Sequence, residues 1–165
     1  MKKAVFFDRD GVLNVDKNYL YKIEEFEWQP EAMQAIKFLK EQGYFIAVVT
    51  NQSGVARGYY TEQDVHKLHE YMQSELAKIG THIDAFYHCP HLPDANVVEY
   101  ALECDCRKPA PGMIIKACAE YSINPEQSLL IGDKQRDIEA GEAAGVKSYL
   151  YREGSLLEFV RKIVR

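Results

Sequence analysis

The sequence predicts an α/β fold in which about five parallel strands form one Rossmann-like sheet with helices on both faces. Short apolar segments that suit buried strands alternate with longer segments in which apolar residues recur at helical spacing. The first strand, helix and second strand form a unit that implies a parallel pair with a right-handed crossover. The chain has 165 residues, enough for one core and too few for two ordinary domains. We therefore expect a single domain over residues 1–165.

Each expected element has its own local signal. Pro30 suits the first turn of a helix, and Gly43 suits its end. Thr61, with Asp64 three residues later, resembles a capping box at the start of a long amphipathic helix. Residues 14–28 show no sustained period and are expected to form a loop over the end of the first strand. The expected strands cover residues 4–7, 44–49, 85–88, 128–131 and 149–151, and the expected helices begin near residues 30, 61, 111, 133 and 155.

Composition excludes several classes of protein. The formal net charge is -5, from 20 basic and 25 acidic residues, and no basic run is present, so the signature of a nucleic-acid-binding protein is missing. The N-terminal segment lacks a signal-peptide core, and no apolar run reaches membrane-spanning length. We expect a cytoplasmic monomer that acts on a small molecule, without nucleic-acid or membrane partners.

Two carboxylates directly follow the first expected strand. Side chains alternate along an extended segment, so Asp8 and Asp10 can point into the same space while Arg9 points away. Adjacent acids repel each other and need a shared proton or a cation such as Mg²⁺. Gly11 then permits a sharp turn. The alternative is an acidic turn without chemistry, since Asp and Gly are common in turns.

Other polar residues are expected at the same edge of the sheet. Thr50 and Asn51 follow the second strand, Asp133 follows the fourth, and Lys108 precedes the helix that begins near Pro111. The carboxyl ends of the strands in an open α/β sheet form the edge where ligands bind. The sequence therefore predicts one site assembled from four distant segments.

This set of residues suits phosphoryl transfer, which needs a nucleophile, a proton donor and positive charge around the phosphoryl oxygens. Asp8 can attack phosphorus, and Asp10 can give and take the proton. Mg²⁺ held by Asp8 and Asp133 can neutralise both the phosphate and the nucleophile. Lys108 and Thr50 can hold the oxygens.

Three of the four cysteines fall into two short clusters within residues 88–108. Together with one histidine they supply enough ligands for a closed, structural Zn²⁺ site. The alternative is a set of reduced cysteines without metal, whereas their uneven placement does not suit a disulfide framework. The expected zinc ligands are Cys89, His91, Cys104 and Cys106.

Four segments resemble, in chain order, the motifs of haloacid dehalogenase-like (HAD) phosphatases. They are Asp8-Arg9-Asp10-Gly11, Thr50-Asn51, Lys108 and Gly132-Asp133-Lys134-Gln135-Arg136-Asp137. Family members that cleave carbon–halogen bonds lack the second acid, so the resemblance points to a phosphatase. The chain has no room for a large cap domain between these motifs, so no such cap is expected. It implies that Asp8 is the nucleophile, that Asp10 is the general acid/base, and that Thr50 and Lys108 bind the phosphoryl group. The implied magnesium ligands are Asp8, Asp10 and Asp133.

The cysteine loop resembles that of a small group of HAD phosphatases that act on heptose bisphosphate or histidinol phosphate. The resemblance implies removal of the C7 phosphate of a heptose 1,7-bisphosphate through an aspartyl phosphate, for the synthesis of bacterial surface polysaccharide. The alternatives are a histidinol-phosphate phosphatase or a phosphatase for another small sugar phosphate. A more distant alternative is a phospho-receiver module. Arginine and lysine residues in the motifs favour a second anionic group on the substrate. The implied substrate contacts are Asp16, Lys17, Asn18, Tyr19, Asn51, Gln52, Ser53, Arg57, Arg107 and Lys134.

Overall fold

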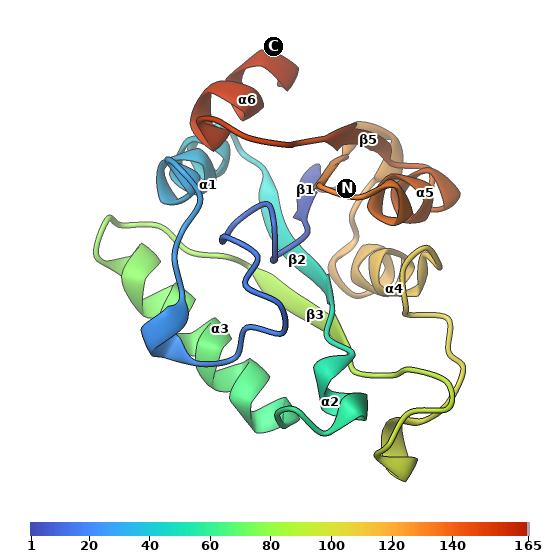
Figure 1. The fold of residues 1–165 in the computed structure, drawn as a ribbon. Coiled ribbons are helices and arrows are strands. Elements are labelled where there is room, and N and C mark those ends of the chain that lie inside the picture. Colours follow the sequence, from blue (N-terminus) through green and yellow to red (C-terminus); the bar gives the residue numbers. More distant parts are fainter. Residues whose placement is uncertain (165) are drawn as a thin grey trace.

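The computed structural model describes residues 1–164 and contains a five-stranded sheet of order β3-β2-β1-β4-β5, in which every neighbouring pair is parallel. This confirms the predicted fold class (Figure 1). The strands are β1 (Ala4–Phe7), β2 (Phe45–Asn51), β3 (Ala85–Cys89), β4 (Leu129–Gly132) and β5 (Lys147–Leu150). The α-helices are α1 (Ala32–Glu41), α2 (Gly54–Arg57), α3 (Glu62–Ala77), α4 (Gly112–Tyr121), α5 (Gln135–Ala143) and α6 (Leu156–Ile163).

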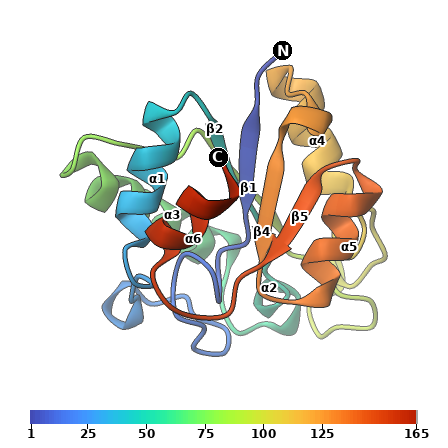
Figure 2. The same ribbon diagram turned by 90° about the horizontal axis from the view of Figure 1, so that it is seen from above.

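Helices cover both faces of the sheet (Figures 1 and 2). Side chains of α1, α3 and α6 form one apolar core with Val5 and Phe7 of β1. Side chains of α4 and α5 form the other core with Ala4 and Phe6. Successive β1 residues therefore enter opposite cores, which explains why the whole strand is apolar and fully buried.

The boundaries of α1 and β2 differ from the predicted ones. Helix α1 begins at Ala32 instead of Pro30, because Glu31 takes a left-handed conformation with φ of 56° immediately before it. Strand β2 continues through Thr50 and Asn51, which pair with β3 instead of following the strand as a turn. Strand β1 has the predicted bounds, and β3, β4 and β5 differ from the prediction by one or two residues at their ends.

The region after β2 contains one helix that the sequence did not reveal. Helix α2 has only four residues, too few to show an apolar period. The capping box predicted at Thr61 and Asp64 is present, and α3 then runs to Ala77. Among residues 1–164, no helix is both long and apolar enough to cross a bilayer.

The strand order reverses direction between β1 and β4. From β1 the chain moves outward to β2 and β3, then returns to place β4 on the other side of β1 and continues to β5. Ligands of open α/β sheets bind outside the carboxyl ends of the strands at such a switch point. Asp8 follows β1 there and Asp133 follows β4, so the topology brings the two acids together.

Candidate active site

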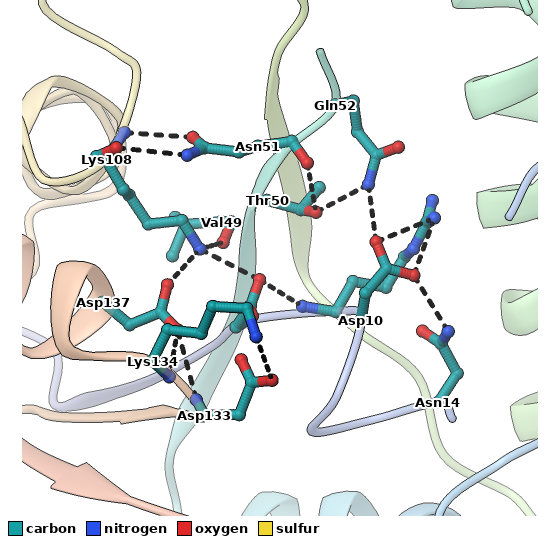
Figure 3. Close-up of polar contacts among 12 residues, drawn as sticks. Asp10, Asn14, Val49, Thr50, Asn51, Gln52, Lys108, Asp133, Lys134 and Asp137 are labelled. Carbon is teal, nitrogen blue, oxygen red and sulfur yellow. Dashed lines mark hydrogen bonds and ion pairs between the residues drawn. The ribbon is translucent and has the colours of Figure 1, made fainter. Parts of the chain in front are cut away.

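A buried lysine, Lys108, lies at the base of the site, where its side chain extends towards Asp137 and Val49 (Figure 3). Asp8 lies against the same lysine. The Lys108 Nζ atom donates to Asp8 Oδ1 at 2.9 Å and to the Val49 carbonyl oxygen at 2.9 Å, and it lies 2.7 Å from Asp137 Oδ1. The backbone N–H of Arg9 also donates to Asp8 Oδ1. Burial raises the pKa of Asp8 well above its ordinary value, and the Lys108 charge only partly opposes this effect. The two carboxylates keep the pKa of Lys108 raised although burial acts to lower it.

Asp137 completes this buried charge network, although sequence reasoning gave it no role in the site. Its Oδ2 atom accepts the backbone N–H groups of Asp133 and Lys134 at 3.1 Å each, so it also fixes the turn between β4 and α5. Burial acts to raise the pKa of Asp137, but the Lys108 ammonium lowers it below its ordinary value. The one-turn spacing from Asp133 was the available sequence signal.

A group of three carboxylates can hold a divalent cation. One oxygen each from Asp8, Asp133 and Asp137 lies within 4.8 Å of the others. Among the described residues, Asp133 Oδ1 is buried without a hydrogen-bond partner. A Cβ atom at Gly11 would stand 2.0 Å from Asp133 Oδ2, so glycine keeps this approach open. Crowded carboxylates with an unpartnered oxygen fit Mg²⁺, which prefers oxygen ligands.

The carboxylate of Asp10 faces a different set of partners. Arg9 Nη2 donates to both of its oxygens at 3.1 and 3.2 Å, and Asn14 Nδ2 and Gln52 Nε2 each donate at 3.0 Å. Burial acts to raise the pKa of Asp10, but these donors lower it below its ordinary value. The expectation that Arg9 points away was wrong: its side chain is fully buried and folds back to orient Asp10.

The end of β2 supplies two amide side chains that organise the site. Gln52 Nε2 donates to Thr50 Oγ1 at 2.8 Å, and the Tyr60 hydroxyl donates to Gln52 Oε1 at 2.5 Å. Asn51 binds the backbone of Lys108 in both directions, accepting its N–H at 3.0 Å and donating to its carbonyl oxygen at 3.2 Å. Thr50 and Lys108 are buried beneath the pocket, where the lysine amine reaches Asp8.

A pocket of about 330 Å³ opens over Asp8 and Asp10. Four cationic side chains line it, and sequence reasoning did not assign the fourth, Arg136, which lies on the first turn of α5. Lys17 does not line it, because its Nζ donates to the Glu25 carbonyl oxygen at 2.7 Å. Every other predicted substrate contact does. The lining residues besides the two acids are Asp16, Asn18, Tyr19, Asn51, Gln52, Ser53, Arg57, Tyr60, Arg107, Lys134 and Arg136.

The two cysteine segments meet beside the pocket. Cys104 Sγ lies 3.5 Å from Cys89 Sγ and 3.3 Å from Cys106 Sγ, while His91 Nδ1 lies 3.7 and 3.4 Å from Cys89 and Cys106 Sγ. Tetrahedral zinc with bonds of about 2.3 Å would separate two sulfurs by about 3.8 Å, so a small expansion would admit the ion. Burial raises the pKa of Cys104, but neighbouring thiols outweigh it and lower the pKa to about 7. Cys118 lies outside this cluster, in α4.

Comparison with known proteins gives consistent matches. A HAD-hydrolase-like family model matches residues 105–158. The D-glycero-alpha-D-manno-heptose-1,7-bisphosphate 7-phosphatase of Photorhabdus laumondii is 45% identical over 153 residues, covering 92% of this chain and 84% of the relative. The beta-anomer 7-phosphatase of Pasteurella multocida is 45% identical over 148 residues, covering 90% and 80%. The crystal structure of the B. bronchiseptica D,D-heptose 1,7-bisphosphate phosphatase, complexed with magnesium and phosphate, has a TM-score of 0.82 at 33% identity and covers 97% and 86% of the two chains.

Proposed function

Because the chain belongs to the D-glycero-D-manno-heptose-1,7-bisphosphate 7-phosphatase family of HAD-like phosphatases, we propose that it removes the C7 phosphate of this heptose bisphosphate. The observation that carries the proposal is the juxtaposition of Asp8 and Asp10 with four cationic side chains in one pocket. The acids provide the chemistry at one phosphate, and the cations provide binding for a second. Histidinol phosphate carries an amine in place of the second phosphate, and the cations would repel it.

Asp8 is the proposed nucleophile. Lys108 and the Arg9 N–H hold its Oδ1 atom, which leaves Oδ2 to attack phosphorus and displace the sugar oxygen. The product of this step is an aspartyl phosphate, and attack of water on phosphorus then releases phosphate and restores the carboxylate. The fixed Lys108 charge stabilises negative charge on the phosphoryl oxygens without reorganisation.

Asp10 is the proposed general acid/base. Its three side-chain partners stabilise the carboxylate form, which suits the second step, where Asp10 takes a proton from the attacking water. A phosphate dianion bound next to Asp10 raises its pKa, because like charges favour the neutral acid. In the first step the protonated Asp10 can therefore donate to the departing sugar oxygen.

The carboxylates of Asp8 and Asp133 are the proposed magnesium ligands. Asp137 already accepts two backbone N–H groups and faces Lys108, and the Asp10 side chain is occupied by its own donors, so neither side chain is assigned to the metal. The bound ion supplies positive charge against the phosphate and the nucleophile. A separate zinc ion, held by the two cysteine segments, is proposed to brace the loop that presents Arg107 and Lys108.

The test is a comparison of phosphate release from both anomers of the heptose 1,7-bisphosphate, histidinol phosphate and several hexose bisphosphates. The heptose bisphosphate is expected to have the highest kcat/KM, and phosphorus NMR should identify heptose 1-phosphate as the product. Faster hydrolysis of histidinol phosphate, or loss of the C1 phosphate, would contradict the proposal. Continuous release of phosphate would also distinguish this enzyme from a phospho-receiver, which would form a long-lived acyl phosphate.

A further inference from the structure

A third group of side chains with potential metal-ligand atoms lies outside the active-site pocket, between α3 and β3. Glu62 and His66 are one turn apart on α3 and therefore share one helix face. His88 of β3 meets them: its Nε2 atom lies 3.3 Å from Glu62 Oε1, and its ring centroid lies 5.4 Å from that of His66. One potential ligand atom from each residue lies within 4.8 Å of the other two.

We propose that Glu62, His66 and His88 bind a divalent transition-metal ion such as Zn²⁺ or Ni²⁺. Two imidazoles and one carboxylate form the donor set that these borderline ions favour, whereas Mg²⁺ and Ca²⁺ favour oxygen ligands alone. Three protein ligands leave at least one coordination position for water. An ion pair of Glu62 with His88 would need no further partner, but His66 brings a third donor atom to the same point.

The surrounding structure fixes two of the ligands before any metal arrives. The side chain of His88 is 15% exposed, and its backbone pairs with Thr50 in the sheet. Glu62 is the first residue of α3 and lies within the Thr61–Asp64 capping box that sets the start of the helix. Only His66 is exposed and must lose side-chain freedom on binding.

The position of the proposed site links two functional segments. The chain before Glu62 contributes Arg57 and Tyr60 to the pocket, and His88 directly precedes Cys89 of the cysteine cluster. A metal ion here would tie the start of α3 to the end of β3. Because such an ion binds the folded chain, it is expected to raise the melting temperature, and the rise should grow with the free ion concentration above the dissociation constant.

The test is calorimetric titration of the full chain with Ni²⁺, in excess Mg²⁺ to occupy the carboxylates near Asp8. The expected result is saturable binding that His66→Ala weakens by at least roughly tenfold, because even changes around metal ligands cost about 10–100-fold in affinity. The same substitution should remove the Ni²⁺-dependent rise in melting temperature. His66 is exposed, so this variant is expected to fold, and His88→Ala should give the same losses.

His82→Ala is the matched control, because His82 is also an exposed histidine next to a carboxylate, 2.9 Å from Asp84 Oδ1. Among residues 1–164, no third ligand joins this pair. Its Ni²⁺ affinity should equal that of the unmodified chain. Equal affinity of the unmodified chain and His66→Ala would place nickel elsewhere, including the cysteine cluster, and would overturn the proposal. Absence of Ni²⁺ binding by the unmodified chain would also overturn it. Neither result depends on the identity of the phosphatase substrate.

Discussion

Lys108 Nζ lies 2.7 Å from Asp137 Oδ1 beneath the active site, and the two side chains are 2% and 1% exposed. The same amine donates to Asp8, so one buried cation is shared by the proposed nucleophile and by a residue outside the pocket. Removing one member of a buried ion pair leaves an uncompensated charge, which costs about 3–5 kcal/mol. Asp137 is therefore expected to support both stability and catalysis.

Asp137→Asn should lower the free energy of unfolding by about 3 kcal/mol, the lower end of that range, because Lys108 keeps Asp8 as a partner. It should also lower kcat, since the lysine amine is no longer held from both sides. Urea unfolding and phosphate release measure the two effects. Glu75→Gln, which breaks the surface pair with Lys78, is the control and should change neither. If Asp137→Asn were as stable as the unmodified chain, the ion pair of Lys108 and Asp137 would make no net contribution to the free energy of unfolding.

Asp10→Asn should lower kcat by about 10²–10⁴-fold, the usual contribution of general acid/base catalysis. The amide keeps the shape of the side chain but cannot transfer the proton. Single-turnover phosphate release is the measurement, and circular dichroism checks the fold. Asp94→Asn is the control, because Asp94 is exposed outside the pocket and its φ of 60° is one that asparagine tolerates. If Asp10→Asn kept most of the activity of the unmodified chain, Asp10 could not be the general acid/base.

Much of this site could be predicted because its signals are local in the chain. The apolar run of β1 followed by Asp8 and Asp10 predicted both a buried strand and the acids at its end. The order of strand ends then predicted that Asp133 and Lys108 come to the same edge. These predictions needed only periodicity, turn chemistry and the rule for ligand sites in parallel sheets.

The remaining features depend on packing between distant segments. Arg9 is drawn inward by the Leu20 carbonyl oxygen and by His69, neither of which the β1 motif reveals. Arg136 reaches the pocket because of the direction in which α5 leaves the sheet. His88 contacts His66 because of the way α3 packs against β3. Residue spacing along one element contains no information on these contacts.

The contact between Arg9 and His69 predicts a pH dependence of stability. His69 Nε2 lies 3.3 Å from Arg9 Nη1, and its ring stacks on Phe86. Burial lowers the pKa of His69 well below its ordinary value, and Arg9, His88 and His66 act in the same direction. Below about pH 6.5 the unfolded chain therefore binds a proton that the folded His69 does not, so the contribution of His69 to the free energy of unfolding falls as the pH is lowered.

Urea unfolding between about pH 7.5 and 5.5 measures this slope, with the window set around the unperturbed histidine pKa of about 6.5. His69→Gln keeps a polar partner for Arg9 but cannot titrate, so its stability should depend less on pH than that of the unmodified chain. His82→Ala removes an exposed histidine. This control should keep the lowered pKa of His69 and therefore the contribution of His69 to the pH dependence of stability. Identical slopes for His69→Gln and the unmodified chain would contradict the prediction.

The proposed zinc and magnesium sites should respond differently to chelation. Mild chelation is expected to remove Mg²⁺ and activity, and added Mg²⁺ should restore activity, because carboxylate sites for this ion keep several waters. Cys104→Ser should instead lose zinc and lower the melting temperature, because binding of structural zinc contributes to folding. Cys118→Ser is the matched control, since Cys118 lies outside the cluster. Elemental analysis that finds no zinc in the unmodified chain would contradict the zinc site.

Arg107 is expected to recognise the phosphate that is not cleaved. Its side chain lines the pocket. Its Nη1 donates to the His91 carbonyl oxygen at 3.4 Å, which is long for a hydrogen bond. The guanidinium is therefore available for a bidentate phosphate contact. A charge-assisted contact of about 1.5–3 kcal/mol corresponds to roughly tenfold to a hundred-and-fifty-fold in kcat/KM. Arg107→Ala should therefore lose this factor on the heptose bisphosphate. Its loss on p-nitrophenyl phosphate, which lacks a second phosphate, should be much smaller.

The comparison of the two substrates separates recognition from support of the loop. Arg107 follows Cys106 and precedes Lys108, so a purely structural role would move the zinc cluster and the buried amine together. Both substrates would then lose activity equally, and zinc content would fall. Arg152→Ala removes an exposed arginine outside the pocket and should leave both activities unchanged. A selective loss on the bisphosphate with full zinc content would assign Arg107 to the distal phosphate, because only that substrate offers a second anion for the guanidinium to bind.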